Sequence, residues 1–285
     1  MGLPLPHVWM AGFSLILVRL PEIAKVLLVL LSLGVEQQQV QEMLTAIISA
    51  VTSILVVLVT YSLNSYREAK SKEKRDYERV VSTYLNPLRL SLVENYFRLS
   101  EILARASESD GKHEALLYVD NAEEVSEKPS KWFNNHGCYL ISSCYITARL
   151  FYYLDKVRLD LTYLKLSQKD DTELISQVTI LSRFFRQGYG VYYLLQPSIG
   201  NDIYLASEQR LMTYREFCQL LQNPEARVWF DRLLNFYIEM GKGKQLKRSE
   251  DILSAIQNMS LFLDNLAGGG NSIQERLEIE GISSF

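Results

Sequence analysis

Residues 44–63 read LTAIISAVTSILVVLVTYSL, a run of twenty residues without Asp, Glu, Lys, Arg or His. An α-helix rises about 1.5 Å per residue, so a run of this length reaches across roughly 30 Å, the thickness of the hydrocarbon core of a bilayer. A buried helix in a soluble protein rarely needs so long an uninterrupted apolar stretch. The sequence therefore predicts a transmembrane helix over residues 44–63.

Basic side chains follow this run closely, whereas residues 35–43 before it contain no Lys or Arg. Because positively charged flanks stay on the cytoplasmic side of a membrane, we expect the anchor to lie in the inner membrane of the cell and the C-terminal body to be cytoplasmic. The same charges are expected to contact membrane lipid and no nucleic acid, since acidic residues interleave with them and the chain has a net charge of −3. The basic residues are Arg67, Lys70, Lys72, Lys74, Arg75 and Arg79.

Residues 1–34 contain two apolar runs separated by Arg19, Pro21, Glu22 and Lys25. One interpretation is an amphipathic helix in the membrane interface, with Arg19, Glu22 and Lys25 facing water. The other is a second membrane helix that forms a hairpin with the first. Each charge at the centre of a bilayer costs about 2.5–3.5 kcal/mol, which favours the interfacial helix, but both interpretations remain open.

The rest of the chain is long enough to bury a hydrophobic core. Its three cysteines, Cys138, Cys144 and Cys218, are odd in number and form no CxxC pair, which is typical of a reducing compartment rather than of a disulfide framework.

We divide the chain into an N-terminal hydrophobic segment (1–34), the membrane helix (44–63), a basic juxtamembrane helix or linker (64–86), a helical bundle domain (87–266) and a flexible C-terminal tail (267–285).

The body has apolar residues at helical spacing and no alternating strand pattern of useful length. We therefore predict an all-α fold, in which a bundle of five to seven helices follows the anchor. Asn86 and Pro87 are expected to break or kink the helix, because a proline disfavours the helical conformation of the residue before it. Asn223 and Pro224 are typical of a helix start. Residues 202–212 are expected to be helical, and residues 271–285 to form a frayed tail with one weak helical turn.

Signatures of catalysis are missing from the sequence, which has no phosphate-binding loop, no HExxH or GxSxG motif, and no Cys/His spacing typical of a zinc site. We therefore expect no cofactor and no metal. The candidates for a catalytic acid or base are Glu208 and His136, of which His136 lies close to Cys138 in sequence. Neither pattern is specific, so an enzyme is the less favoured class.

A polar cluster within an otherwise apolar, tyrosine-bearing stretch is the best candidate binding site. Its residues could form a buried hydrogen-bond network, although a solvated face or a structural ion pair is the commoner role of such residues. The candidate binding residues are Tyr204, Glu208, Gln209 and Arg210, with Arg215 and Glu216 nearby.

Four stretches of the body carry a resemblance to other proteins: YLISSCYITARLFYYL (139–154), DIYLASEQRLM (202–212), YREFCQLL (214–221) and VWFDRLLNFY (228–237). Together they resemble an unannotated group of bacterial all-helical proteins that are often membrane-tethered. The resemblance implies a bacterial source and a helical body, and it marks Glu208 and Gln209 as positions of interest. It implies no activity.

The chain has seventeen tyrosines, whose amphipathic rings suit partner surfaces as well as helix packing. Together with the anchor, they favour a membrane-anchored helical module that binds a protein partner or forms a homo-oligomer. Two alternatives remain open. One is an enzyme that acts on a lipid or small molecule at the membrane surface, and the other is a small oligomeric channel or transporter accessory built on the hairpin.

Overall fold

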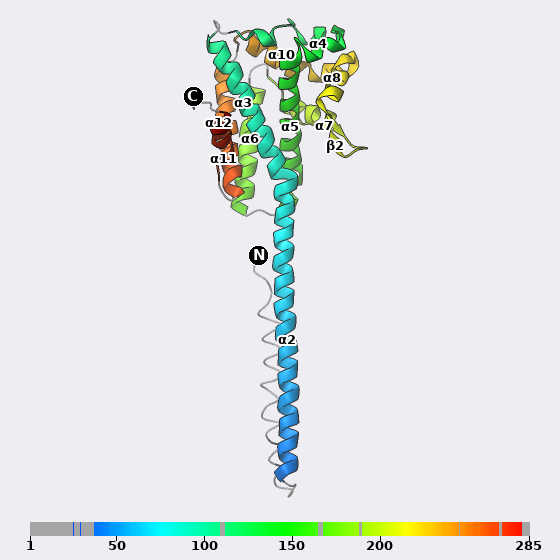
Figure 1. The fold of residues 1–285 in the computed structure, drawn as a ribbon, viewed down its shortest axis with the longest axis vertical. Coiled ribbons are helices and arrows are strands. Elements are labelled where there is room, and N and C mark those ends of the chain that lie inside the picture. The colour runs from blue at the N-terminus through cyan, green and yellow to red at the C-terminus, as the bar shows by residue number, and fades with distance from the viewer. Residues whose placement is uncertain are drawn as a thin grey trace. The chain divides into compact units, whose positions relative to one another are not determined.

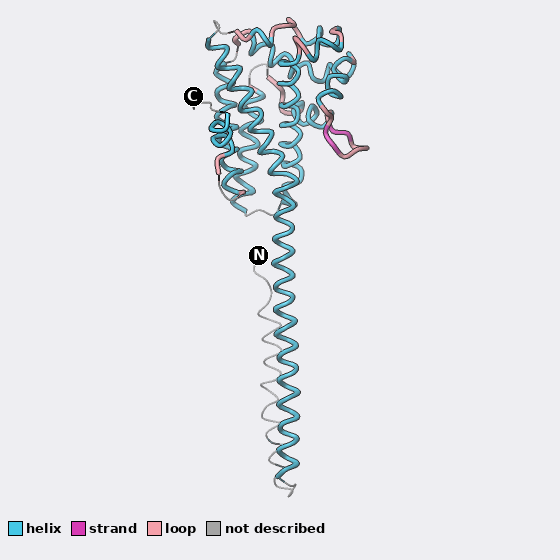
Figure 2. Tube along the Cα trace, in the orientation of Figure 1, coloured by secondary structure: helices cyan, strands magenta, loops and turns pink. Residues whose placement is uncertain are grey.

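The computed structural model describes residues 25, 29, 37–108, 112–164, 168–187, 190–244, 246–267 and 270–280. Helices account for most of this part, and the only sheet in it has two strands of two residues each (Figure 2). The predicted all-α class is therefore confirmed. The chain divides into two compact units, Met1–Glu73 and Lys74–Phe285, and helix α2 (Gln37–Val80) begins in the first and ends in the second (Figure 1).

Helix α2 is 44 residues long and contains the apolar run. Side chains of the run are exposed, among them Ile48, Ile54 and Val57, which is 66% exposed. Thr52 and Ser53 donate their hydroxyls to backbone carbonyls one turn earlier, at 2.8 Å each, so these polar groups are satisfied within the helix. In the part of the chain that is described, one helix is long and apolar enough to cross a membrane, and it includes this run.

Residues 1–34 are described only at Lys25 and Val29, both of which are helical. The choice between an interfacial helix and a membrane hairpin therefore lies outside the described residues. The channel or transporter alternative depends on that hairpin, so it stays a prediction as well.

The chain stays helical through Asn86 and Pro87, where we expected a break or a kink. A π-helical turn, η1 (Val81–Leu85), joins α2 to α3 (Asn86–Glu108), and the Asn86 N–H donates to the carbonyl of Val81, five residues earlier. In an α-helix the ring of Pro87 would clash with the carbonyl four residues before it. The wider π turn accommodates the proline, and the helix continues.

The rest of the Lys74–Phe285 unit contains both short and long helices. In chain order its elements are η2 (Glu114–Leu116), η3 (Ala122–Glu127), α4 (Ser130–Asn134), α5 (Cys138–Leu164), α6 (Gln168–Arg186), α7 (Leu195–Asp202), β1 (Tyr204–Leu205), β2 (Arg210–Leu211), α8 (Tyr214–Gln222), α9 (Pro224–Arg227), η4 (Val228–Phe230), α10 (Asp231–Gly241), α11 (Leu246–Leu266) and α12 (Ser272–Glu280).

The long helices of this unit pack side by side around one hydrophobic core. α3 packs against α5 and α11, and α6 packs against the same two helices (Figure 1). Their inward side chains, such as Leu92, Phe151 and Phe185, are buried together with Tyr237 of α10. This core supports α7, α8 and the hairpin, which carry the candidate site.

Two helices begin where local signals place them. Thr213 caps α8, because its side chain accepts the N–H of Glu216 while the Glu216 carboxylate accepts the N–H of Thr213. Asn223 caps α9, with Pro224 at its first position, as the sequence predicted.

Residues 204–211 form a hairpin, although we predicted a helix over residues 202–212. α7 ends at Asp202, and β1 then pairs antiparallel with β2. Gln209, in the turn between the strands, has a φ of 52°, which tight hairpin turns use and an α-helix excludes. The prediction was wrong because the apolar spacing of Tyr204 and Leu211 fits a helix as well as two short strands.

Residues 272–280 form a packed helix, α12, instead of the predicted frayed tail. Ile273 and Leu277 are buried against α3. The first amide of the helix, the Ser272 N–H, donates to the buried carboxylate of Asp264 on α11 at 2.8 Å. The prediction of a flexible tail is therefore wrong for these residues, because burial and a capping carboxylate fix them to the body.

Candidate functional site

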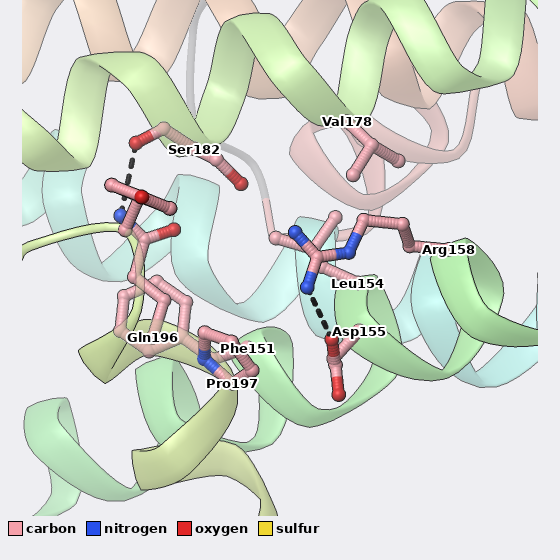
Figure 3. A pocket seen from close by; sticks show the side chains of 9 residues that line it. Phe151, Leu154, Asp155, Arg158, Val178, Ser182, Gln196 and Pro197 are labelled. Atoms are coloured by element: carbon pink, nitrogen blue, oxygen red, sulfur yellow. Dashed lines mark hydrogen bonds and ion pairs between the residues drawn. The ribbon is translucent and has the colours of Figure 1, made fainter.

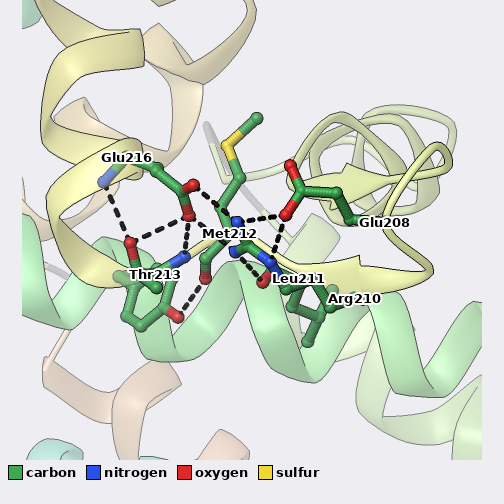
Figure 4. A network of polar contacts seen from close by, with 7 residues as sticks. Glu208, Arg210, Leu211, Met212, Thr213 and Glu216 are labelled. Carbon is green, nitrogen blue, oxygen red and sulfur yellow. Dashed lines mark hydrogen bonds and ion pairs between the residues drawn. The ribbon is translucent and has the colours of Figure 1, made fainter.

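The candidate binding residues lie on the hairpin and at the start of α8 (Figure 4). Arg210, on β2, donates from Nε to Glu208 Oε2 at 2.7 Å. Its Nη1 and Nη2 donate to the two carboxylate oxygens of Glu216 at 2.7 Å each. Glu216 also accepts the N–H of Thr213 at 2.7 Å and its hydroxyl at 2.9 Å. The network therefore ties the hairpin to the first turn of α8.

Every charge in this network has a partner. The Arg210 guanidinium, together with hydrogen bonds from Thr213, holds the pKa of Glu216 far below its usual range. The Glu208 side chain is 53% exposed, so the arrangement is a solvated ion-pair network rather than a buried one. Exposed ion pairs contribute little to stability, and a group whose partners are already bound is a poor acid or base.

Tyr204 and Gln209 lie apart from this network. The Tyr204 ring stacks on that of Tyr152 in α5, with 5.2 Å between the ring centroids. Gln209 supplies the turn of the hairpin through its positive φ. The structure therefore brings together two of the four candidate binding residues, Glu208 and Arg210, and adds Glu216, which the sequence marked only as a neighbour.

His136 lies in the turn before α5, and Cys138 is the first residue of α5. His136 is exposed in the turn between α4 and α5, and its ring lies beside that of Tyr118, with 4.8 Å between the centroids. Within the described residues, no hydrogen bond or ion pair joins His136 to a thiol or a carboxylate. A catalytic histidine needs such a group to orient it and to set its protonation state.

A buried histidine that the sequence did not single out precedes η2. His113 is 3% exposed, and its ring stacks on that of Tyr139 in α5, with 4.8 Å between the centroids. Neither ring nitrogen has a hydrogen-bond partner in the described part of the chain. Burial lowers the pKa of His113, and the positive charge of Arg105 lowers it further. The folded chain therefore disfavours a protonated His113.

We expect His113 to reduce stability in acid. The pKa of a histidine in an unfolded chain is about 6.5, and the pKa of His113 is lower in the folded chain, although Glu101 partly opposes the shift. As pH falls, the unfolded chain binds the proton first, so the free energy of unfolding decreases below about pH 6.5 and is unaffected by His113 above it. Urea titrations of the full chain between neutral pH and about pH 5 should show this loss.

His113→Leu is the matched control for this pH dependence. The leucine fills the buried site with an apolar side chain that cannot bind a proton. The variant should lose less stability than the wild type over the same pH interval. An equal loss in both proteins would contradict the assignment to His113.

The six basic residues that follow the apolar run are all exposed on α2. Lys74 forms an ion pair with Glu78, one turn later, with 3.7 Å between nitrogen and oxygen. Because both side chains are largely exposed, this pair leaves the charge of Lys74 accessible to other anions.

A small cleft opens between α5, α6 and α7 (Figure 3). Its volume of ≈ 30 Å³ is about that of one water molecule. Asp155 accepts hydrogen bonds from Arg158 at 2.9 Å and from Asn201 at 3.2 Å, and Gln196 donates to the Ser182 carbonyl at 2.9 Å. The cleft is therefore too small, and its polar groups too well bonded, to take a ligand.

Within the described ranges, no group of three or more His, Cys, Asp or Glu side chains is placed to hold a metal ion. No protein-family model, curated protein or solved structure matches the chain.

Proposed function

We propose that this protein is a membrane-anchored helical module that binds a protein partner or self-associates, with its body in the bacterial cytoplasm. The observation that carries the proposal is the exposure of the apolar side chains along α2. Each exposed Å² of apolar surface costs about 25 cal/mol in water, and soluble monomers rarely leave so long an apolar surface uncovered. A bilayer would cover it over the full length of the run.

The proposed orientation rests on charge. Six exposed basic side chains follow the apolar run on α2, and such residues stay on the cytoplasmic side and attract anionic lipid head groups. The three cysteines are free thiols, which agrees with a reducing compartment.

The proposed binding role rests on two exposed surfaces. Val228 and Trp229, on η4, are exposed by more than half, and aromatic side chains are enriched where proteins bind one another. On α2, small residues at spacings of three and four would let a second helix approach closely, which supports self-association. These small residues are Ala46, Ser49, Ala50 and Ser53.

An enzymatic role has less support. Glu208 is bound to Arg210, and His136 stands on a different turn beside Tyr118. No observation places the two candidates at one site, so we do not propose a reaction for them.

Membrane fractionation tests the anchor. The full chain should stay with the membrane in alkaline carbonate and be released only by detergent. Val56→Lys with Val57→Lys should weaken this retention strongly, because charges in the middle of the run oppose insertion. Asn64→Lys with Ser65→Lys adds the same two charges just after the run and should be retained like the wild type.

Two results would contradict the proposal. One is release of the wild-type chain by carbonate, and the other is equal retention of the two double-lysine variants. Digestion of the body by a protease added outside intact cells would show that the orientation is reversed.

A further inference from the structure

A second cleft lies where α7, α8, α9 and η4 meet. Its volume is ≈ 400 Å³, within the range of pockets that bind small molecules or single side chains. Apolar and aromatic side chains form most of its wall, and one carboxylate lies among them. The lining residues are Ser198, Asp202, Leu220, Ala226, Trp229 and Phe230.

Asp202 is the only ionisable residue of this lining, and its charge has no partner in the part of the chain that the structure describes. No hydrogen bond or ion pair joins its carboxylate to another described residue. Partial burial raises the pKa of Asp202. It is also the last residue of α7, where the helix dipole disfavours a negative charge. Asp202 is also exposed, so its carboxylate stays accessible to a cation that enters the cleft.

Trp229 offers a second attraction for a cation. It lines the cleft and is 56% exposed, so part of its side chain is accessible to a ligand. The face of a tryptophan attracts ammonium and guanidinium groups, and the attraction grows when water is excluded. Leu220 and Phe230 form an apolar wall beside it that an alkyl chain could contact.

The position of Asp202 is fixed by a close approach of two helices. Gly200, in α7, lies so near α5 that a Cβ atom there would be 2.4 Å from the backbone nitrogen of Tyr152. Only glycine permits this approach without a shift of the backbone. The carboxylate, two residues later, is therefore held on a rigid base, which favours defined binding.

We propose that this cleft binds an organic cation, a guanidinium or ammonium group on an alkyl chain, through the Asp202 carboxylate and the face of Trp229. The cation could be an arginine or lysine side chain of a partner protein, in which case the inference rests on the proposed function. It could also be a free alkylamine or alkylguanidine. Both sources present the same chemistry to the cleft.

Calorimetric titration of the full chain in phosphatidylcholine nanodiscs tests this site. Butylguanidinium should bind with saturation, whereas butylurea, its neutral counterpart of the same shape, should not. Asp202→Asn should weaken binding about tenfold or more, because it removes the charge and keeps the shape. Trp229→Leu should weaken it several-fold, by about the size of a cation–π contact.

Glu225→Gln is the matched control. Glu225 is an exposed carboxylate of α9 that does not line the cleft, so its loss should leave binding unchanged. Asp202→Asn should unfold at the same temperature as the wild type or a higher one, since it removes a negative charge from the C-terminal end of α7. A lower unfolding temperature would show that Asp202 supports the fold and would overturn the proposal.

Two peptide probes distinguish the sources of the cation. A blocked alanine peptide with one arginine should bind, and its citrulline counterpart should not, if the cleft accepts a partner side chain. Binding of butylguanidinium without binding of the peptide assigns the site to a free small cation. Equal binding of butylurea, or no effect of Asp202→Asn, would overturn the proposal while leaving the carbonate test of the anchor untouched.

Discussion

Asp264→Ala is expected to lower the free energy of unfolding by about 3–5 kcal/mol, the usual effect of removing one partner of a buried ion pair. Asp264 is 0% exposed and forms an ion pair with Arg89 of α3. Its Oδ2 accepts the N–H of Ser272 at 2.8 Å and the Ser272 hydroxyl at 3.0 Å. The alanine would leave a guanidinium and a helix N-terminus without their carboxylate, so α3, α11 and α12 would lose a shared contact.

Urea titration of the full chain, followed by circular dichroism, measures this effect. Glu250→Ala, which removes an exposed carboxylate from the same helix, should change the free energy of unfolding by less than about 0.5 kcal/mol. Arg89→Met combined with Asp264→Leu should recover most of the loss, because no unpaired charge remains. If Asp264→Ala behaved like Glu250→Ala, the buried ion pair would not stabilise the body.

Asn95→Ala is expected to lower the free energy of unfolding by about 3 kcal/mol, the combined effect of a small cavity and of polar groups left unbonded. Asn95, in α3, is fully buried. Its Nδ2 donates to the carbonyls of Ser91 at 2.7 Å and Ile146 at 3.1 Å. Its Oδ1 accepts the hydroxyl of Thr147 at 2.7 Å, and that hydroxyl lies 2.6 Å from the Tyr237 hydroxyl.

A double-mutant cycle separates this network from simple loss of volume. Thr147→Val and Tyr237→Phe each remove one hydroxyl and nearly keep the shape of the core. Because the two hydroxyls bond to each other, the double variant should lose less stability than the two single losses added together, by at least about 0.5 kcal/mol. Additive losses would show that the hydroxyls act independently.

Local signals in the sequence predicted several features of the fold. The apolar run depends on composition within one helix, and Asn223 with Pro224 depends on atoms only a few residues apart. Such features need no knowledge of distant contacts. Glu208 and Arg210 are likewise only two residues apart, and they contact each other in one hairpin, although their role in binding stays a prediction.

Features that depend on distant contacts could not be predicted in this way. Helix α12 packs on the body because Asp264 accepts its first N–H and α3 contacts its apolar side chains. The sequence of residues 271–285 gives no sign of these distant partners. His113 is buried by Tyr139, which follows much later in the chain. The cleft at Asp202 is formed by residues of four elements. The residues next to Asp202 in sequence therefore do not indicate that its carboxylate lines a cleft.

The π-helical turn at Val81–Leu85 affects how related sequences would align with this chain. A π turn holds one residue more than an α turn of the same span, so it can take up a difference of one residue in length without a loop. In a relative that lacks the extra residue of the π turn and has no proline at the position of Pro87, the same segment could form an ordinary α-helix. It would still present the residues equivalent to Leu88 and Leu92, which are fully buried here, to its core. A gap of one residue in the middle of this long helix would then be compatible with the same fold.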